Sequence, residues 1–175
     1  GGQKADRGTI AGRPVTHVAK AGDEVNHYLE STDGFVVGQA VRVEVDGDWR
    51  RTGSAWHTAG HLIAAVVERR WPELRATNGH HWPGEARVEF DPASADLAGA
   101  VSRELPELVA RAIESDLPVT VVGDPFANRA VAIGDFPPVP CGGTHARSTA
   151  GLPRVEVTKV RPKDGKLRVS YTLRG

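Results

Sequence analysis

The chain has 175 residues, and its 22 basic and 22 acidic side chains balance, so no global positive field points to nucleic-acid binding. Its 39% hydrophobic and 25% charged residues are typical of a soluble globular protein, and a single cysteine excludes an internal disulfide framework. The longest strongly apolar run, residues 62–67, is too short to cross a bilayer, and no signal or transit peptide is visible. We therefore expect a cytoplasmic protein without a membrane partner, built as one medium domain or as a small domain joined to a larger one.

The first 49 residues predict β structure. Alternating side chains give candidate strands at 13–19, 25–31 and 39–45, with a turn at Thr32-Asp33-Gly34. Because three or four short strands bury little surface, we expect residues 1–49 to curl into a small β-barrel subdomain. Residues 50–175 would then form a second, larger domain.

A helix is predicted over residues 53–71, with Ser54 as its N-cap and Pro72 as its stop signal. An apolar stripe at residues 62, 63, 66 and 67 has helical spacing. His57 and His61 are then one turn apart on one face, so both imidazoles can reach one ion.

The remainder predicts a mixture of strands and helices. We expect a turn-rich loop at 76–84 and a helix over 92–115 that Pro106 kinks or splits in two. The other predicted elements are strands at 87–90, 119–122 and 129–133 and a hairpin of 155–160 with 166–173 across the turn 162–165; the strand 119–122 is expected to be central in a sheet.

A second pair of metal-binding residue types follows the segment 136–140. Cys141 and His145 are separated by three residues that include Gly142 and Gly143, so the backbone is expected to turn tightly or to approach another group closely. Histidine pairs on helices often lie in a core or in solvent, and either pair alone is a weak signal. Together they supply three imidazoles and the only thiol, a set that zinc accepts at about 2.0–2.3 Å.

A metalloprotease is not indicated. Thr58 stands where such an enzyme carries a glutamate base next to its first histidine.

The C-terminal segment is locally basic. Two interpretations remain open, a solvated hairpin and an edge that contacts phosphates. Its cations are Arg154, Lys159, Arg161, Lys163, Lys166, Arg168 and Arg174. Arg50, Arg51, Arg69 and Arg70 bracket the predicted metal helix and can extend a phosphate-contacting surface.

These motifs resemble the alanyl-tRNA editing proteins (AlaX-like), which are free-standing relatives of the alanyl-tRNA synthetase editing domain and similar to that of threonyl-tRNA synthetase. The likeness covers nearly the whole chain. Its motifs are Gly1-Gly2-Gln3 with Ala5-Asp6 and Gly8, HTAGH at 57–61, GHHWPGEARVEF at 79–90 and, most specific, PCGGTH at 140–145. The implied fold is α+β, with a small N-terminal β-barrel followed by a zinc-containing α+β editing domain whose sheet packs on helices.

The resemblance implies a zinc-dependent aminoacyl-tRNA hydrolase. Its substrate would be the ester of a mischarged tRNA, typically serine, sometimes glycine, on the alanine tRNA. His57, His61, Cys141 and His145 would be the zinc ligands. If all four bind, a strict tetrahedron has no open position, so catalysis would need a fifth ligand or a displaced one. Zinc would either activate water or hold the amino group or hydroxyl of the substrate.

Further site residues are expected by the same resemblance. Thr77 and Thr144 are candidates to recognise the serine hydroxyl, and His81 is a candidate to orient water or substrate. Gly142 and Gly143 can offer N–H groups to the oxyanion or the terminal adenosine. Arg69, Arg70, Arg161 and Lys163 are the candidate tRNA contacts.

Departures from the family leave alternatives open. The segment 79–85 lacks the glutamine of the synthetase-embedded version, so no water-positioning glutamine is assigned. No synthetase catalytic or tRNA-selecting domain is visible, which favours editing in trans. The substrate can instead be a mischarged threonine tRNA, or one carrying a nonstandard threonine-like amino acid. A zinc-stabilised RNA-binding module without turnover is the non-enzymatic alternative. The expected partner is mischarged aminoacyl-tRNA and not DNA.

Overall fold

The computed structural model describes residues 2–22, 24–124 and 127–175; Gly1, the first residue of the predicted glycine motif, lies outside them. The chain divides into two compact units. One joins the start of the chain, up to Gln3, to Gly53–Gly175, and the other is Lys4–Thr52. The boundary falls inside the first helix, α1 (Gly47–Arg70). Each unit is described by itself.

The Lys4–Thr52 unit contains an open antiparallel sheet. Its strands are β1 (Gly8–Ile10), β2 (Arg13–Ala21), β3 (Glu24–Leu29) and β4 (Val43–Val45), in the order β3-β2-β1-β4. The predicted closed barrel is wrong for the described residues, because β3 and β4 lie at opposite edges and do not pair. β4 has only three residues, and side chains such as Val25 and Val43 are more than half exposed, so the sheet encloses no interior.

Helix α1 begins six residues earlier than predicted. Asp46 is its N-cap, because Oδ1 of Asp46 accepts a hydrogen bond of 2.9 Å from the backbone nitrogen of Trp49. Ser54, the predicted cap, lies buried inside the helix. The predicted end is confirmed, since the helix stops at Arg70, before Pro72.

The other unit is built on a four-stranded antiparallel sheet. Its strands are β5 (Arg75–His80), β6 (Arg87–Asp91), β10 (Arg154–Lys163) and β11 (Lys166–Arg174), in the order β10-β11-β6-β5. The predicted loop at 76–84 is wrong in its first half, because these residues pair with β6 as an edge strand. The predicted hairpin of β10 and β11 is confirmed. Asp164 (φ 52°) and Gly165 (φ 78°) form its two-residue turn, and positive φ at both positions suits a two-residue hairpin.

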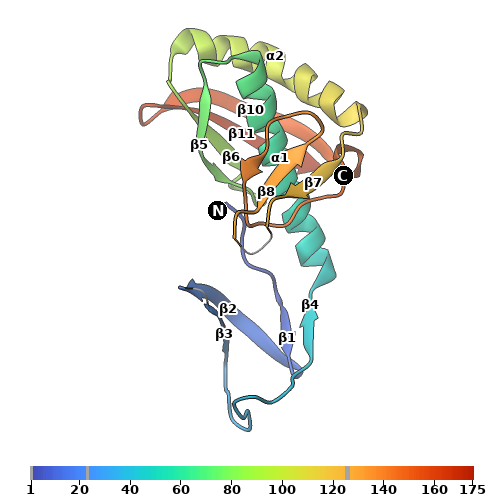
Figure 1. Cartoon of the computed structure of the whole chain (residues 1–175). Coiled ribbons are helices and arrows are strands. Elements are labelled where there is room, and N and C mark those ends of the chain that lie inside the picture. Colours follow the sequence, from blue (N-terminus) through green and yellow to red (C-terminus); the bar gives the residue numbers. More distant parts are fainter. Residues whose placement is uncertain (1, 23, 125–126) are drawn as a thin grey trace. The chain divides into compact units, whose positions relative to one another are not determined.

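Both helices of this unit pack on one face of that sheet (Figure 1). From the sheet, Val88, Phe90, Leu167, Val169 and Tyr171 point into the core. From α1 and α2 (Ala95–Glu114), the buried side chains that meet them include Leu62, Ile63, Val66, Val67, Val101, Leu105 and Val109. Helix α2 runs continuously through Pro106 and is not split into two short helices, because Leu105 and Val109 anchor both sides of the proline in the core.

A smaller antiparallel sheet completes the unit. It contains β7 (Val119–Val122), β8 (Ala130–Ile133) and β9 (Val139–Pro140) in that order, and a short 3-10 helix, η1 (Thr149–Gly151), follows. The predicted central position of residues 119–122 is wrong: β7 is an edge strand, and Val121 is 50% exposed. The apolar run at 119–122 therefore predicted the strand correctly but not its exposure to solvent.

The α+β class is thus confirmed. Within the described residues, neither helix has an apolar stretch long enough to span a membrane.

Candidate metal centre and its cleft

Four potential metal ligands converge from two distant parts of the chain. His57 and His61 lie on α1, and Cys141 and His145 follow β9. One ligand atom from each lies within 4.8 Å of the others. Sγ of Cys141 is 3.6 Å from Nε2 of His57 and 3.3 Å from Nε2 of His145. A tetrahedron with zinc bonds of about 2.0–2.3 Å has edges of about 3.3–3.8 Å, which the two distances from Cys141 match.

Hydrogen bonds fix the orientation of two of the imidazoles. Nδ1 of His57 lies 2.9 Å from Oε1 of Gln3, which can only accept, so Nδ1 carries the hydrogen. The hydroxyl of Thr58 donates to the carbonyl of Ser54 at 2.8 Å, so Nδ1 of His145, 3.1 Å away, donates to that hydroxyl oxygen. In both rings Nε2 is left with a free lone pair that faces Cys141.

Gln3 also connects the helix to the cysteine segment. Its Oε1 accepts a second hydrogen bond, of 2.9 Å, from the backbone nitrogen of Thr144, and its Nε2 donates to Oγ1 of Thr144 at 2.7 Å. Ser54 donates to the same threonine oxygen at 2.8 Å. Thr144 is therefore held directly beside the cluster.

Burial keeps these imidazoles neutral at physiological pH. It lowers the pKa of His57 and His61 to about 4 and that of His145 to about 2, and the neighbouring ring charges act in the same direction on His57 and His145. Neutral imidazole is the form that binds a metal ion.

A further histidine lies against the cluster. The ring of His81 stacks on that of His57, with centroids 5.1 Å apart. Tyr171 donates its hydroxyl hydrogen to the carbonyl of Trp56 at 2.7 Å, so Nδ1 of His81 donates to the tyrosine oxygen at 2.9 Å. Burial lowers the pKa of His81 to about 3. Its Nε2 is therefore an unprotonated acceptor at neutral pH.

Two glycines permit this close packing. A Cβ atom on Gly60 would lie 2.1 Å from Nδ1 of His81, and one on Gly143 would lie 2.2 Å from Cε1 of His57. The predicted close approach of the cysteine segment is thus confirmed at Gly143, whereas Gly142 faces open space. The N–H of Gly143 points to Sγ of Cys141, 3.4 Å away.

A cleft of about 710 Å³ is lined by His61 of the cluster and by the neighbouring His81. This volume is in the range of small-molecule sites. Helix α1, strand β5 and the segment 135–139 form its walls, and Glu68, Arg69, Arg75 and Asn78 supply polar groups.

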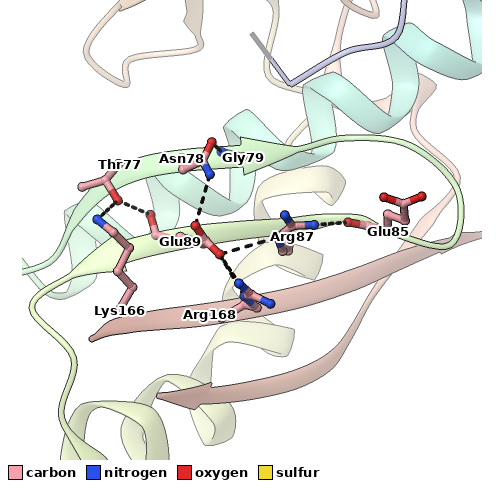
Figure 2. Close-up of polar contacts among 8 residues, drawn as sticks. All are labelled: Thr77, Asn78, Gly79, Glu85, Arg87, Glu89, Lys166 and Arg168. Carbon is pink, nitrogen blue, oxygen red and sulfur yellow. Dashed lines mark hydrogen bonds and ion pairs between the residues drawn. The ribbon is translucent and has the colours of Figure 1, made fainter. Parts of the chain in front are cut away.

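Thr77 is not brought to this cleft. Its hydroxyl donates to the carbonyl of Glu89 at 3.3 Å and accepts from Nζ of Lys166 at 2.9 Å, within a polar network on the main sheet (Figure 2).

The predicted tRNA contacts differ in their surroundings. Arg69 lies 3.0 Å from Asp135 and over the ring of Phe136. Arg70 lies 2.7 Å from Glu104. Arg161 and Lys163 are exposed on β10, without an acidic side chain at ion-pair distance among the described residues.

The sequence interpretation gave no role to three residues that orient the site. In the sequence Gln3 belongs only to a glycine motif, and no local pattern indicates its contacts with distant residues. Thr58 and Ser54 are four residues apart on the helix, a spacing at which a threonine hydroxyl can bond the earlier carbonyl. Tyr171 was indicated only as part of a strand.

No protein-family model matches the chain. Alanyl-tRNA editing protein AlaX-L from Pyrococcus horikoshii is 27% identical over 98% of this chain and 48% of its own length. An alanine–tRNA ligase from Streptococcus thermophilus is 27% identical over 91% of this chain and 21% of the ligase, and one from Kineococcus radiotolerans is 30% identical over 90% and 20%. The chain thus spans about half the length of the first relative and about a fifth of the ligases. The predicted resemblance is confirmed: over nearly all of its length the chain is similar to an alanyl-tRNA editing protein and to part of alanine–tRNA ligases.

Proposed function

We propose that this chain hydrolyses the ester bond of mischarged aminoacyl-tRNA, with a zinc ion held by His57, His61, Cys141 and His145. The observation that carries the proposal is the convergence of these four residues, of which His61 also lines a cleft. The name of the Pyrococcus horikoshii relative, an alanyl-tRNA editing protein, supports the reaction. When bound, zinc would supply a Lewis acid for a substrate oxygen or a water molecule.

The residues around the cluster suit an ester hydrolase. Nε2 of His81 can accept a hydrogen bond from water in the cleft, because the other ring nitrogen is held by Tyr171 and the ring stays neutral. His81 would therefore orient the attacking water. Gly143 directs its N–H to Cys141, which stabilises a thiolate at that position.

We propose serine on the alanine tRNA as the substrate. A hydrophobic pocket distinguishes serine from alanine poorly, whereas a site that hydrogen-bonds a hydroxyl rejects the analogue without it by roughly 10⁴–10⁵. Thr144, fixed beside the cluster by Gln3 and Ser54, is the side chain we assign to that hydroxyl.

Deacylation by the purified protein tests the proposal, with bound zinc measured on the same sample. Added to separately charged tRNAs, the protein should release serine from Ser-tRNA(Ala) and leave Ala-tRNA(Ala) intact, with about one zinc per chain. Release from Ser-tRNA(Thr) alone would replace the proposed substrate with a threonine tRNA. Bound zinc with tRNA binding but no release from any charged tRNA would indicate an RNA-binding module.

Variants separate the roles of the residues. Cys141→Ser should lose both zinc and activity, whereas His81→Asn should keep zinc and lose activity. Glu107→Gln on the exposed side of α2 is the control and should change neither. Full activity in a zinc-free Cys141→Ser protein would contradict the assigned site.

A further inference from the structure

The main sheet has a second face, opposite to the one that the helices cover. Along β11, Leu167, Val169 and Tyr171 are buried in the core, so Arg168 and its alternate neighbours point the other way. Arg161 on β10 and Glu89 on β6 are directly opposite Arg168 in register and share its side. We call this side the basic sheet face.

Positive charge is concentrated on this face. By register it carries three acidic side chains, Glu89, Asp91 and Glu156. Its basic side chains are Arg87, Lys166, Arg168, Arg174, Arg154, Lys159, Arg161 and Lys163. On β6, β10 and β11, eight cations against three anions leave an excess of five positive charges on this face, although the formal net charge of the chain is zero.

The acidic side chains neutralise only part of the face. Glu89 pairs with Arg168 at 2.5 Å and lies 3.5 Å from Arg87, while Asp91 pairs with Lys166 at 2.7 Å. Figure 2 shows the contacts of Glu89 with Asn78, Arg87 and Arg168 across β5, β6 and β11. At the centre of the sheet, two acidic side chains thus offset most of the charge of three basic ones.

The uncompensated charges form a row along β10. Lys159, Arg161 and Lys163 are exposed, and no acidic side chain of the described residues lies at ion-pair distance from them. Successive members are two residues apart on one side of the strand, roughly 6.6–6.8 Å. Because β10 is at the edge of its sheet, the row is open to a large partner.

A groove of about 460 Å³ lies next to this row. Three guanidinium groups line it, those of Arg87, Arg161 and Arg168. Hydroxyl groups of Thr158, Ser170 and Thr172 line the same groove, and Glu85 is the acidic residue among its lining. Guanidinium and hydroxyl donors are the groups that bind phosphate oxygens.

We propose that the basic sheet face binds the phosphodiester backbone of RNA, with Lys159, Arg161 and Lys163 as its principal contacts. The inference rests on the proposed function only for the identity of that RNA, the tRNA that carries the ester. A protein partner would require an apolar or aromatic anchor, and the face positions given by the β10, β11 and β6 registers carry none. Charge and hydrogen-bond donors without apolar anchors fit a polyanionic backbone.

Binding of uncharged tRNA to the whole chain tests the inference, since no ester is involved. Fluorescence anisotropy at several salt concentrations should give a Kd that rises steeply with salt. Replacing Lys159, Arg161 and Lys163 by alanine should weaken binding at least tenfold at low salt. It should also make the slope of log K against log salt shallower by about 2–3, since each lost phosphate contact removes about 0.7–0.9.

A matched triple variant controls for net charge. Arg103, Arg111 and Arg147 are exposed cations of the same unit, outside the basic sheet face, and their replacement by alanine also removes three charges. This control should retain the affinity and the salt slope. Thermal unfolding should show that both triple variants are folded. If the β10 triple variant is not folded, the single variant Arg161→Ala takes its place.

Three outcomes would overturn the inference. Equal loss in both triples would mean that only net charge matters. Unchanged tRNA binding together with aggregation of the β10 triple would mean that the row protects a sheet edge from strand pairing. Binding to anionic lipid vesicles but not to tRNA would assign the face to a membrane surface.

Discussion

Oε1 of Gln3 lies 2.9 Å from Nδ1 of His57 and, at the same distance, from the backbone nitrogen of Thr144. One amide oxygen thus orients a proposed zinc ligand on α1 and the segment that carries two others. Carbonyl partners of this kind fix the tautomer of a ligating histidine and strengthen its basicity.

Replacing Gln3 by alanine should therefore weaken zinc binding by about 10–100-fold without unfolding the protein. A competition titration against a zinc-binding dye measures the affinity, and circular dichroism checks the fold. Gln39→Ala, at an exposed glutamine of the other unit, is the matched control and should leave the affinity unchanged. An unaltered affinity in Gln3→Ala would show that the amide does not orient the site.

Gly60→Ala should displace His81 from its place beside the cluster, because the new Cβ would lie 2.1 Å from Nδ1 of that ring. We expect loss of deacylation and lower thermal stability, even though alanine favours a helix over glycine by about 1 kcal/mol.

Gly99→Ala on α2 is the matched control for this substitution. Its Cβ would meet only the end of the Arg103 side chain, at 3.4 Å, so it should be neutral or stabilising. Thermal unfolding of both variants measures the contrast. A Gly60→Ala protein as stable and active as the Gly99→Ala protein would contradict the packing described.

Sequence patterns predicted correctly the features that depend on residues close together in the chain. The helical spacing of His57 and His61 and the turn chemistry of Asp164-Gly165 both depend on near neighbours in the chain, and both are present in the structure. The predicted start of α1 was wrong because Ser54 and Asp46 are both good N-cap residues. The choice between them depends on where the preceding strand ends.

Long-range relationships were not predictable in the same way. The contact of Gln3 with His57 joins residues 54 positions apart, and no periodicity encodes it. The three-residue strand β4 and the exposed valines around it leave an open sheet, whereas the small burial expected of a few short strands predicted a barrel. Residues 119–122 were misplaced for a related reason, since β propensity does not distinguish an edge strand from a central one.

Acidification should destabilise the metal-free protein below about pH 6.5. Burial lowers the pKa of His81 to about 3, and of His57 and His61 to about 4, from an unfolded value of 6.5. Between about pH 4 and pH 6.5 the unfolded chain binds protons that the folded chain does not, so the free energy of unfolding rises with pH over this range. Each such proton contributes about 1.4 kcal/mol per pH unit well below pH 6.5.

Urea unfolding in the presence of a chelator, at several pH values from 7 to 4.5, measures this dependence. His81→Gln should flatten it by about one proton. His27→Gln, at an exposed histidine of β3, is the control and should leave the dependence as it is. A flat profile in the unsubstituted protein would contradict neutral buried imidazoles.

Arg168 on β11 and Arg161 on β10 are directly opposite each other in register, but their side chains have different contacts. Glu89 is 8% exposed and accepts hydrogen bonds from Arg168 and Asn78; burial alone would raise its pKa, but these bonds and the nearby arginines hold the pKa below its usual value. Arg168→Ala would leave this carboxylate buried with only weaker partners, at a cost of about 3 kcal/mol. Arg161→Ala removes an exposed cation without an acidic partner among the described residues, and should change stability by less than about 0.5 kcal/mol.

Urea unfolding at pH 7 compares these two variants with the double variant Glu89→Gln and Arg168→Ala. Because the double variant has no buried unpaired charge, it should recover a large part of the stability that Arg168→Ala loses. If the double variant is instead less stable than Arg168→Ala by the full cost of Glu89→Gln measured alone, the two residues do not interact, and the pairing of Glu89 with Arg168 on the basic sheet face is wrong.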